Sequence, residues 1–517
     1  MEKGSPAVSR EPMGQLSLVH SLEYAAAVHA DRAALRLAGG NMTWGQTRER
    51  VARIGGALRE AGVRPGDRVA VGLANRPEYL ELFYSIAWAG GIVAPLNTRL
   101  TESDLRGYMD CIAPRLVVSD SLQVTQAVQQ KYPVVAIEGA APGTGLDDLA
   151  AQGPSVGPHL RHEDDIAVLF GTGGTTGIPK AVAHTDRSLV SNAYHTVMEL
   201  GYDEHTVYLH AAPMFHIADC CSLFAVTLRG GSHAFLERFS PQGFLTVMQQ
   251  RQVTATLLVP TMISAVLDSD SLARTDLSAW RTLFYGGAPI HPRLLDRALA
   301  ELSCDLVQGY GMTEISLGAI LGARPHHAVR HNGPDFPLAR SCGRPATGVR
   351  IRISGAEIPG DVGEIEVAGP NVFCGYWDNG VAKDVRQDGW FKTGDLAFQD
   401  AEANIYIVDR AKDVIITGGE NVYSIEVERA IQALPGVKDA VVIGLPDPYW
   451  GERIHALVVP SSPDVTAADM TVQLHGKLAG YKRPRSYDFV QNLPRTPAGK
   501  INKAELVHRY SVQEQER

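Results

Sequence analysis

The chain has 517 residues, more than one hydrophobic core ordinarily organises, so two or more domains are expected. Its 45% hydrophobic and 20% charged residues are typical of a globular protein and exclude a disordered or fibrous chain. The net charge of −9 argues against nucleic acid as a partner, because a polyanion attracts basic surfaces.

Cysteine usage and the terminal segments indicate a cellular compartment. The six cysteines are few for this length and include no Cys-x-x-Cys pair, which fits a reducing environment. Residues 1–6 lack the apolar core of a signal peptide, and no apolar run reaches membrane-spanning length. We therefore expect a cytoplasmic monomer or homodimer with no integral membrane segment.

The first part of the chain alternates helical and strand patterns. Residues 43–59 place apolar side chains at helical spacing, with Thr43 as a plausible N-cap. Residues 68–73 and 92–96 are typical of buried strands, and residues 80–91 between them predict a helix ending at two glycines. Further strands are predicted at residues 166–170, 254–260 and 282–287. This alternation predicts a large N-terminal domain of parallel α/β layers.

The pattern changes after about residue 340. Residues 349–353 and 363–367 alternate apolar and charged side chains, which predicts half-exposed strands of a small antiparallel barrel-like region. From residue 413 onward, strand and helix patterns predict a small, mobile α+β C-terminal domain of an ordinary size. We place the domains at residues 1–409 and 413–517, with a hinge at 410–412.

The most informative segment is residues 171–180, GTGGTTGIPK, which follows a predicted buried strand. Glycines let backbone N–H groups turn inward to bind an anion, threonines add hydroxyl donors, and a lysine adds positive charge. Pro179 before Lys180 excludes a Walker loop, and Thr176 stands where a dinucleotide fingerprint needs glycine. The candidate polyphosphate-binding residues are Thr172, Gly173, Gly174, Thr175, Thr176, Gly177 and Lys180.

Four further motifs follow in order: residues 308–314 (QGYGMTE), 390–396 (WFKTGDL), 409–423 (DRAKDVIITGGENVY) and 494–500 (PRTPAGK). Together with the glycine loop, this set resembles the adenylate-forming superfamily of acyl- and aryl-CoA synthetases, adenylation domains and firefly-type luciferases. The resemblance covers nearly the whole chain. It implies that a carboxylate attacks the α-phosphate of ATP with the help of Mg²⁺, and that the resulting acyl-adenylate passes its acyl group to coenzyme A.

The resemblance also implies roles for individual residues in the adenylation step. Lys500 contacts the carboxylate and the α-phosphate, and Thr313 binds the α-phosphate. Glu314, with Thr175, ligates Mg²⁺, which prefers oxygen. Two acceptor oxygens of Asp395 suit the ribose hydroxyls, with Arg410 assisting. The remaining ATP-binding residues, where Tyr310 stacks on adenine, are Gly287, Ala288, Pro289, Gln308, Gly309, Tyr310 and Gly311.

The second half-reaction is implied to follow a swing of the C-terminal domain about Lys412, which withdraws the adenylation lysine and presents a glycine-containing face to the thiol. The residues expected along the route of coenzyme A are Gly418, Gly419, Trp450, Arg99, Lys482 and Arg483. Two positions depart from the family pattern: Gly173 replaces a usual serine and Ala181 a usual glycine. We expect these changes to weaken or slow the handling of pyrophosphate.

The acid substrate is predicted from the lining of the acyl pocket. His216 stands where amino-acid adenylating domains place an aspartate, so an α-amino acid lacks its partner. His216 is also a candidate catalytic residue that gates the tunnel or touches the carboxylate. The full set of predicted pocket residues is His216, Ile217, Leu257, Gly286, Gly309, Ser316 and Leu317. This apolar lining favours a hydrophobic monocarboxylate, whether aryl, cinnamoyl-type or fatty.

Three other functions stay open from the sequence. The acyl-adenylate could be loaded onto a separate carrier protein, or a luciferase-like oxygenase or a non-catalytic nucleotide-binding regulator could share these motifs. One further pattern is His327 and His331, which stand four apart as metal ligands on a helix might. Pro325 and Gly333 around them favour a loop, so no metal site is predicted there.

Overall fold

The computed structural model describes residues 16–137, 145–172, 180–333, 336–462, 465–495 and 501–515. The chain divides into two compact units. Unit 1 contains residues 1–339, 345–350 and 368–389, and unit 2 contains residues 340–344, 351–367 and 390–517. Within these described ranges, no helix combines the length and hydropathy needed to span a bilayer. The predicted hinge lies inside unit 2 by this division, and the domain boundaries stay a prediction.

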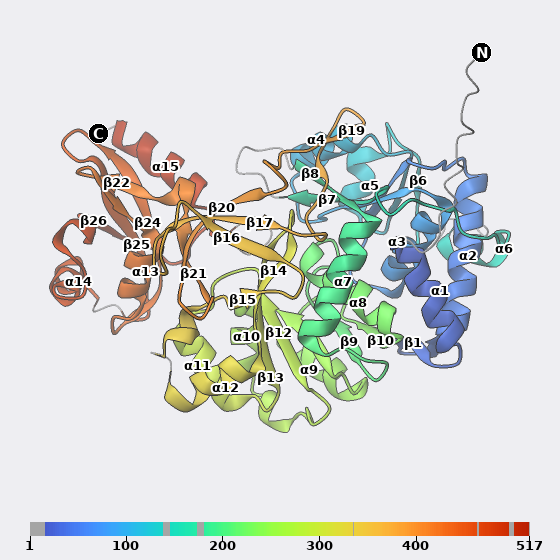
Figure 1. The fold of residues 1–517 in the computed structure, drawn as a ribbon, viewed down its shortest axis with the longest axis horizontal. Coiled ribbons are helices and arrows are strands. Elements are labelled where there is room, and N and C mark those ends of the chain that lie inside the picture. Colours follow the sequence, from blue (N-terminus) through green and yellow to red (C-terminus); the bar gives the residue numbers. More distant parts are fainter. Residues whose placement is uncertain are drawn as a thin grey trace, which may run out of the picture. The chain divides into compact units, whose positions relative to one another are not determined.

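One mostly parallel sheet of unit 1 follows the predicted strand–helix alternation (Figure 1). Pairings from β13 through to β1 are parallel, and the pairings of β14 and β2 are antiparallel. In spatial order the strands are β15 (Arg344–Pro345), β14 (Ser316–Leu321), β13 (Asp305–Met312), β12 (Thr282–Gly286), β11 (Ala255–Leu258), β9 (Val207–His210), β10 (Ser232–Phe235), β1 (Ala33–Leu37) and β2 (Gly40–Thr43).

A second sheet of unit 1 carries the glycine loop. Its β3, β4, β5, β6 and β7 pair in parallel, and β8, β18 and β19 extend it antiparallel. The order is β19 (Val381–Lys383), β18 (Gly375–Asp378), β8 (Lys180–Thr185), β7 (Ile166–Thr172), β4 (Ile92–Pro95), β3 (Arg68–Gly72), β5 (Leu116–Ser119) and β6 (Val134–Val135). The strand that precedes the loop is therefore buried within this sheet, as predicted.

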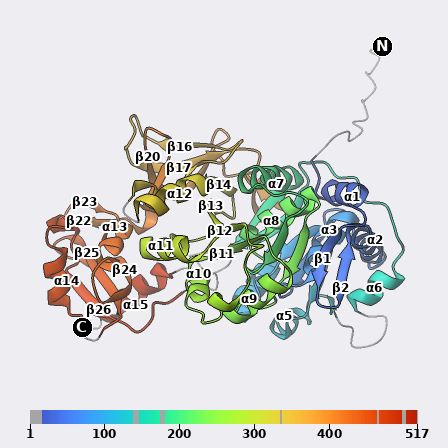
Figure 2. The same ribbon diagram turned by 90° about the horizontal axis from the view of Figure 1, so that it is seen from below.

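Helices join the two sheets of unit 1. The long helices α7 (Asp186–Leu200) and α8 (Ile217–Arg229) lie side by side (Figures 1 and 2), and α7 contacts both β8 and β14. The other helices are α1 (Leu18–Val28), α2 (Trp44–Glu60), α3 (Pro77–Ala89), α4 (Glu102–Ile112), α5 (Leu122–Val128), α6 (Leu146–Gln152), α9 (Pro241–Gln250), α10 (Pro260–Leu267), α11 (Pro292–Glu301), α12 (Ala323–Asn332) and the 3₁₀ turn η1 (Leu272–Arg274).

Local sequence signals explain where helices start and stop. Thr43 caps α2 through a capping box: its hydroxyl accepts the N–H of Gln46, and the Gln46 side chain accepts the N–H of Thr43. Helix α3 ends at Gly90 in a left-handed conformation (φ 91°). Both predicted helices are confirmed. The loop predicted around His327 is wrong, because Pro325 lies in the first turn of α12, where no N–H is needed.

Unit 2 contains an antiparallel four-stranded sheet and a small α+β region. The first sheet has the order β16 (Arg350–Ser354), β17 (Gly363–Ala368), β20 (Phe391–Gln399) and β21 (Ile405–Arg410). The second has the order β23 (Glu420–Val422), β22 (Ile415–Thr417), β25 (Gly451–Pro460) and β24 (Val437–Asp447), with β26 (Ser486–Phe489) beside β25. The helical elements are η3 (Ala411–Asp413), α13 (Ser424–Gln432), α14 (Ala467–Leu474), η4 (Gly480–Lys482) and α15 (Lys503–Gln515).

The α+β region of unit 2 has apolar clusters on both faces of its sheet. Alternate residues of β24 divide between them: Val442 joins a cluster with Val427 of α13, and Val441 joins one with Leu506 of α15. The short elements β15 (Arg344–Pro345) and η2 (Pro337–Arg340) lie where the chain crosses between the units. The predicted fold class, parallel α/β layers followed by a smaller mixed region, is confirmed.

Candidate functional site

The glycine loop joins two antiparallel strands of unit 1. β7 ends at Thr172 and β8 begins at Lys180, and these two residues are paired across the ladder. The Thr172 hydroxyl donates to the carbonyl oxygen of Lys180 at 3.4 Å. Five of the predicted phosphate-binding residues, Gly173, Gly174, Thr175, Thr176 and Gly177, lie outside the described residues, so their roles stay predictions.

One face of β8 carries the next groups of the site. Lys180 and His184 are an even number of residues apart, and Tyr376 of β18 is paired with Val182 between them. Since paired residues of antiparallel strands project to the same face, Lys180, Tyr376 and His184 share one face of the sheet. The ammonium of Lys180 lies 4.8 Å from the centre of the Tyr376 ring.

The motif at residues 308–314 crosses from β13 into a tight turn before β14. A Cβ on Gly311 would lie 1.8 Å from the carbonyl oxygen of Ser316, so only glycine fits there. Ser316 adopts a positive φ of 55°, which closes the hairpin. Thr313 and Glu314 therefore lie at the turn of the β13–β14 hairpin.

Two side chains of the second sheet hold this turn. His184 is fully buried, and its Nε2 lies 2.7 Å from the carbonyl oxygen of Thr313 while its Nδ1 lies 3.0 Å from the Ser188 hydroxyl. Because the carbonyl can only accept, Nε2 carries the proton of the neutral ring. Burial lowers the pKa of His184 to about 4, so the ring is neutral at pH 7. His184 thus fixes the backbone of Thr313.

Glu314 is 6% exposed and its carboxylate faces a tyrosine. The Tyr376 hydroxyl donates to Oε1 of Glu314 at 2.9 Å, and the backbone N–H of Phe373 donates to the Glu314 carbonyl oxygen at 2.9 Å. Burial raises the pKa of Tyr376, so its phenol keeps its proton and acts as a donor. The predicted metal ligand is therefore a buried carboxylate with one lone-pair site already oriented.

The fit of this carboxylate to Mg²⁺ follows from donor chemistry. Within the described part of the chain, no group of three or more His, Cys, Asp or Glu side chains gathers as a metal cage. Mg²⁺ is commonly held by one or two carboxylates together with substrate phosphates. Glu314, which Tyr376 links to Lys180 at the start of β8, fits that kind of site, where Mg²⁺ would neutralise charge on phosphate oxygens.

The predicted adenine side lies at the carboxyl ends of β12 and β13. Gly287 has a φ of 78°, and Ala288 and Pro289 follow it in a loop. The side chain of Gln308 accepts a hydrogen bond from the Tyr285 hydroxyl at 3.2 Å, and Tyr310 is 8% exposed on β13. These strands are neighbours in the sheet, so the two predicted segments end at the same edge.

Two of the seven predicted acyl-pocket residues, Gly286 and Gly309, lie on these two strands. Gly286 is paired with Gly309, and a Cβ on Gly286 would approach the carbonyl oxygen of Gly309 to 2.4 Å. A Cβ on Gly309 would meet the Phe284 ring at 2.6 Å and Leu317 at 3.0 Å. These glycines are therefore needed for packing as well as for any space left to a substrate. Leu257 is buried on β11.

The other predicted pocket residues flank α7 and α8. His216 is half-buried at the N-cap of α8, in contact with the Phe215 ring (centroids 4.6 Å apart), and Ile217 follows it. Asn192 of α7 accepts the backbone N–H of Leu317 at 3.2 Å and so ties β14 to this helix. The structure places His216 at the N-terminus of α8, and its catalytic role stays a prediction.

Asp395 and Arg410, the predicted ribose-side pair, are together in unit 2. They are partners in the ladder between β20 and β21, and Nε of Arg410 lies 2.8 Å from Oδ1 of Asp395. The carboxylate is 7% exposed and the guanidinium 42% exposed. The ion pair with Arg410 balances the charge of the Asp395 carboxylate. An ionised carboxylate only accepts hydrogen bonds, so Asp395 suits two hydroxyl donors.

The hinge and lysine motifs also belong to unit 2. Lys412 is exposed in the short turn η3. Lys500 lies outside the described residues, and its loop is bounded by a bridge between Arg495 and Ile501. Immediately after the loop, Lys503 pairs with Glu428 of α13 at 2.7 Å. The described residues on either side of 496–500 are thus held by a bridge and an ion pair within unit 2.

The residues expected along the coenzyme A route are partly brought together. Gly418 and Gly419 form the left-handed turn between β22 and β23 (φ 61° and 83°), and the N–H of Gly418 donates to the Trp450 carbonyl oxygen at 2.8 Å. Lys482 forms an ion pair with Glu426 at 2.8 Å. Arg99 is exposed after β4 in unit 1, while Arg483 follows η4 in unit 2.

The sequence alone does not predict three contacts around the candidate site, which involve His184, Tyr376 and Arg485. The period of two along β8 places His184 on the same face as Lys180, but it does not indicate that His184 contacts Thr313. Tyr376 lies on β18, and no local pattern indicates its contact with Glu314. Arg485 lies with its guanidinium 3.9 Å from the centre of the Trp450 ring, a cation–π contact between segments far apart in sequence. No local pattern indicates that contact.

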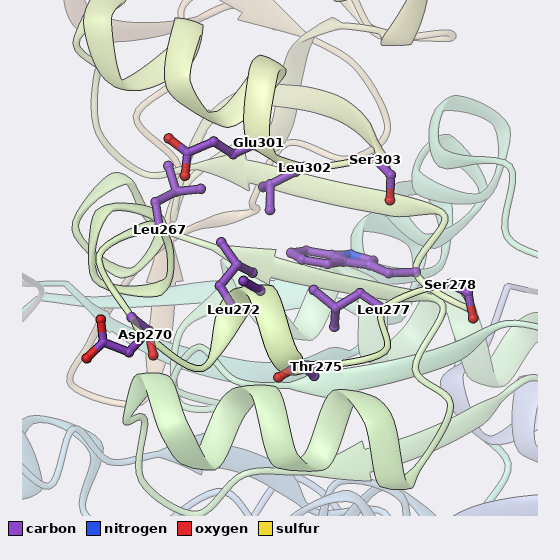
Figure 3. Close-up of a pocket in the computed structure, with 12 residues that line it drawn as sticks. Leu267, Asp270, Leu272, Thr275, Leu277, Ser278, Glu301, Leu302 and Ser303 are labelled. Carbon is purple, nitrogen blue, oxygen red and sulfur yellow. The ribbon is translucent and has the colours of Figure 1, made fainter.

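A pocket of about 670 Å³ opens elsewhere in unit 1, around Trp280 (Figure 3). Leucines from α10, η1 and the segment before β12 line it together with Asp270 and Glu301. Its lining, within the described residues, contains none of the predicted ATP-, acid- or coenzyme A-binding residues. The pocket is therefore separate from the candidate site.

Acid should destabilise the fold through His184. Below pH 6.5 the unfolded chain binds a proton at this histidine, whereas the folded chain does so only near pH 4. The neutral His184 ring therefore makes its full contribution to the free energy of unfolding above pH 6.5. This contribution falls by up to about 3 kcal/mol as the pH drops toward 4. Urea unfolding at several pH values should show a shallower acid loss in His184→Gln than in the native chain. Equal slopes would contradict this expectation.

Comparisons with known proteins find family models and relatives that match most of the chain. The model of the AMP-binding enzyme family matches residues 22–377, and that of the AMP-binding enzyme C-terminal domain matches residues 426–500. A feruloyl-CoA synthase of Amycolatopsis sp is 37% identical over 489 residues, covering 92% of this chain and 96% of the relative. A long-chain-fatty-acid–CoA ligase of Mycobacterium tuberculosis is 31% identical, covering 91% of this chain and 93% of the relative.

A solved structure is similar over most of the chain. The o-succinylbenzoate coenzyme A synthetase of Bacillus subtilis, in complex with ATP and a magnesium ion, superposes with a TM-score of 0.82 at 28% identity. The match covers 94% of this chain and 98% of that one.

Proposed function

Because this chain belongs to the family of AMP-binding enzymes, in the acyl- and aryl-CoA synthetase branch of the adenylate-forming superfamily, we propose that its acid is of the ferulate type. The chain is an AMP-forming acid–CoA ligase with ATP, Mg²⁺ and coenzyme A as its small-molecule requirements. It converts a carboxylic acid and ATP to an acyl-adenylate and pyrophosphate, and then transfers the acyl group to coenzyme A with release of AMP.

The single observation that carries the choice of acid is the 37% identity with the feruloyl-CoA synthase over 489 residues. A second observation supports it: the Ser316 hydroxyl, a predicted acyl-pocket group, is buried and hydrogen-bonds to no protein group that the structure describes. An acid with ring oxygens would satisfy that donor, whereas an alkyl chain would leave it unsatisfied at a cost in free energy.

The residue roles are proposed as follows. Lys180 and the glycine loop bind the phosphates, and Thr313, held by His184, donates to the α-phosphate. Glu314 holds Mg²⁺. Asp395, beside Arg410, accepts hydrogen bonds from the ribose hydroxyls. Lys500 balances the charge that develops as the carboxylate oxygen bonds to the α-phosphorus and the bond to pyrophosphate breaks. The acyl-adenylate carbonyl then accepts the thiol sulfur of coenzyme A, with AMP as leaving group.

An acid panel tests this proposal. The purified chain is incubated with ATP, Mg²⁺ and either ferulate or a medium- or long-chain fatty acid, and pyrophosphate and AMP are measured with and without coenzyme A. We expect kcat/KM for ferulate to exceed that for each fatty acid by at least about tenfold. A preference for fatty acids would overturn the choice of acid, and adenylate formed without thioester would indicate a carrier protein as acceptor. The Glu314→Gln variant serves as the low-activity control.

The hinge role of Lys412 predicts an uneven loss. Proline fixes φ near −65° and so restricts the linker that must change conformation between half-reactions. Lys412→Pro should slow thioester formation from supplied acyl-adenylate by about tenfold or more, while adenylation changes less. Lys412→Ala removes the charge and keeps backbone freedom, so it is the matched control. An unchanged coenzyme A step in the proline variant would exclude Lys412 as the pivot.

The cellular location is also proposed. ATP and coenzyme A are supplied in the cytoplasm, and the described cysteines are unpaired thiols, which fits a reducing compartment. A cytoplasmic location is therefore the proposal, and fractionation of the expressing cells would test it.

A further inference from the structure

Tyr376 lies between Lys180 and Glu314, the groups proposed above to bind phosphate and Mg²⁺. Its position is set by β18, which pairs with β8 so that Tyr376 stands opposite Val182, between Lys180 and His184. The ring is braced by an edge-on contact with Phe373, with centroids 5.1 Å apart and planes at 70°. Strand pairing therefore positions the backbone of Tyr376, and packing against Phe373 positions its ring.

The two polar contacts of this side chain reach different elements. The hydroxyl donates to the Glu314 carboxylate at 2.9 Å, and the ring face lies 4.8 Å below the Lys180 ammonium. Glu314 belongs to the β13–β14 turn of one sheet, whereas Lys180 begins β8 of the other. One residue thus bridges the two sheets of unit 1 where the phosphate loop ends.

We propose that Tyr376 is a positioning residue that orients Glu314 for Mg²⁺ and Lys180 for the phosphates at the same time. The hydrogen bond to Oε1 leaves Oε2 as the oxygen to face the cation, and the ring holds the ammonium near the loop without neutralising its charge. This inference rests on the proposed role of Glu314 as the Mg²⁺ ligand. In this proposal Tyr376 acts through Glu314 and Lys180.

Two variants separate the two contacts. Tyr376→Phe removes the hydroxyl and keeps the ring beneath Lys180, while Tyr376→Leu removes both. Binding of α,β-methylene-ATP, which cannot be cleaved at the reacting bond, is measured by calorimetry with and without Mg²⁺. In Tyr376→Phe we expect metal-free affinity to be unchanged and the Mg²⁺-dependent gain to fall about tenfold. In Tyr376→Leu we expect metal-free affinity to fall as well, by about fivefold.

The matched control is Tyr132→Phe. Tyr132 is another tyrosine of unit 1 beneath a lysine, with the Lys131 ammonium 5.5 Å from its ring centre, and its hydroxyl donates to the Met109 carbonyl at 3.3 Å. This change removes the same atom away from the site and should alter neither affinity. We also expect the half-saturating Mg²⁺ concentration to rise about tenfold in Tyr376→Phe and to stay unchanged in the control.

The contrary outcomes are distinct. If Tyr376→Phe keeps its Mg²⁺-dependent gain, or loses metal-free and Mg²⁺-dependent affinity together with thermal stability, the positioning role is wrong. If Glu314→Gln also leaves the Mg²⁺ dependence unchanged, the failure lies in the proposed metal ligand. Should the phenylalanine variant not fold, Lys180→Gln and Glu314→Gln can be combined: coupling through Tyr376 predicts non-additive effects on affinity, and additive effects would contradict it.

Discussion

Replacing Lys500 with alanine should reduce the rate of acyl-adenylate formation by about 100-fold or more. In the proposed mechanism this lysine balances charge on the attacking carboxylate and the α-phosphate, so its interaction is strongest in the transition state. Thioester formation from supplied acyl-adenylate should be nearly unchanged, because Lys500 has no role in the step in which AMP leaves. Pyrophosphate release from acid and ATP measures the first half-reaction, and single-turnover assays with the adenylate measure the second.

Two other lysines control for this result. Lys477 is an exposed lysine of the same unit, so Lys477→Ala should alter neither half-reaction. Lys503 pairs with Glu428 and with the Ser424 hydroxyl, so its loss should lower stability and affect both half-reactions together. Equal loss of both half-reactions in Lys500→Ala would contradict the assigned role and point to a structural one.

Replacing Arg161 with leucine should destabilise unit 1 by about 3–5 kcal/mol. Arg161 and Asp186 are buried, with Nε of the arginine 2.7 Å from Oδ2 of the carboxylate. The guanidinium also donates to the carbonyl oxygens of Gly91 at 2.7 Å and Ile166 at 2.6 Å. Burial raises the pKa of Asp186 while the arginine opposes that shift, so the variant leaves a buried carboxyl group and two carbonyls without their donor.

Urea unfolding measures this effect against a close control. Arg187 is 40% exposed and pairs with the exposed Asp164, so Arg187→Leu should cost no more than about 1 kcal/mol. The double change Arg161→Leu with Asp186→Leu should recover part of the loss, because no buried charge is then left alone. A single variant at Arg161 that is as stable as the Arg187 control would show that the buried pair contributes little.

The consequence of that loss would reach the active site through α7. Asp186 is the first residue of this helix and also accepts the backbone N–H of Leu18 at 2.9 Å. Farther along the helix, Asn192 holds the N–H of Leu317 in β14. An anchored helix start thus helps to set the position of the strand that carries predicted acyl-pocket residues.

Local signals determine where several helices of the fold begin and end. Thr43 and Gln46 predict the start of α2, and the glycine after α3 predicts its end, because caps and left-handed turns depend on only a few neighbouring residues. The prediction of a loop around Pro325 is wrong for an equally local reason. Pro325 lies in the first turn of α12, where proline breaks no helical hydrogen bond.

The sequence by itself determined the chemical groups available to this protein: a glycine loop with Lys180, the Thr313–Glu314 pair, Asp395, Arg410 and Lys500. It also determined the family, whose models match residues 22–377 and 426–500. Only the tertiary structure decided which groups support them. Tyr376 reaches Glu314 across 62 residues of chain, and His184 reaches Thr313 across 129. Such contacts depend on how two sheets pack, and packing is set by the whole core, so no short pattern of residues encodes them.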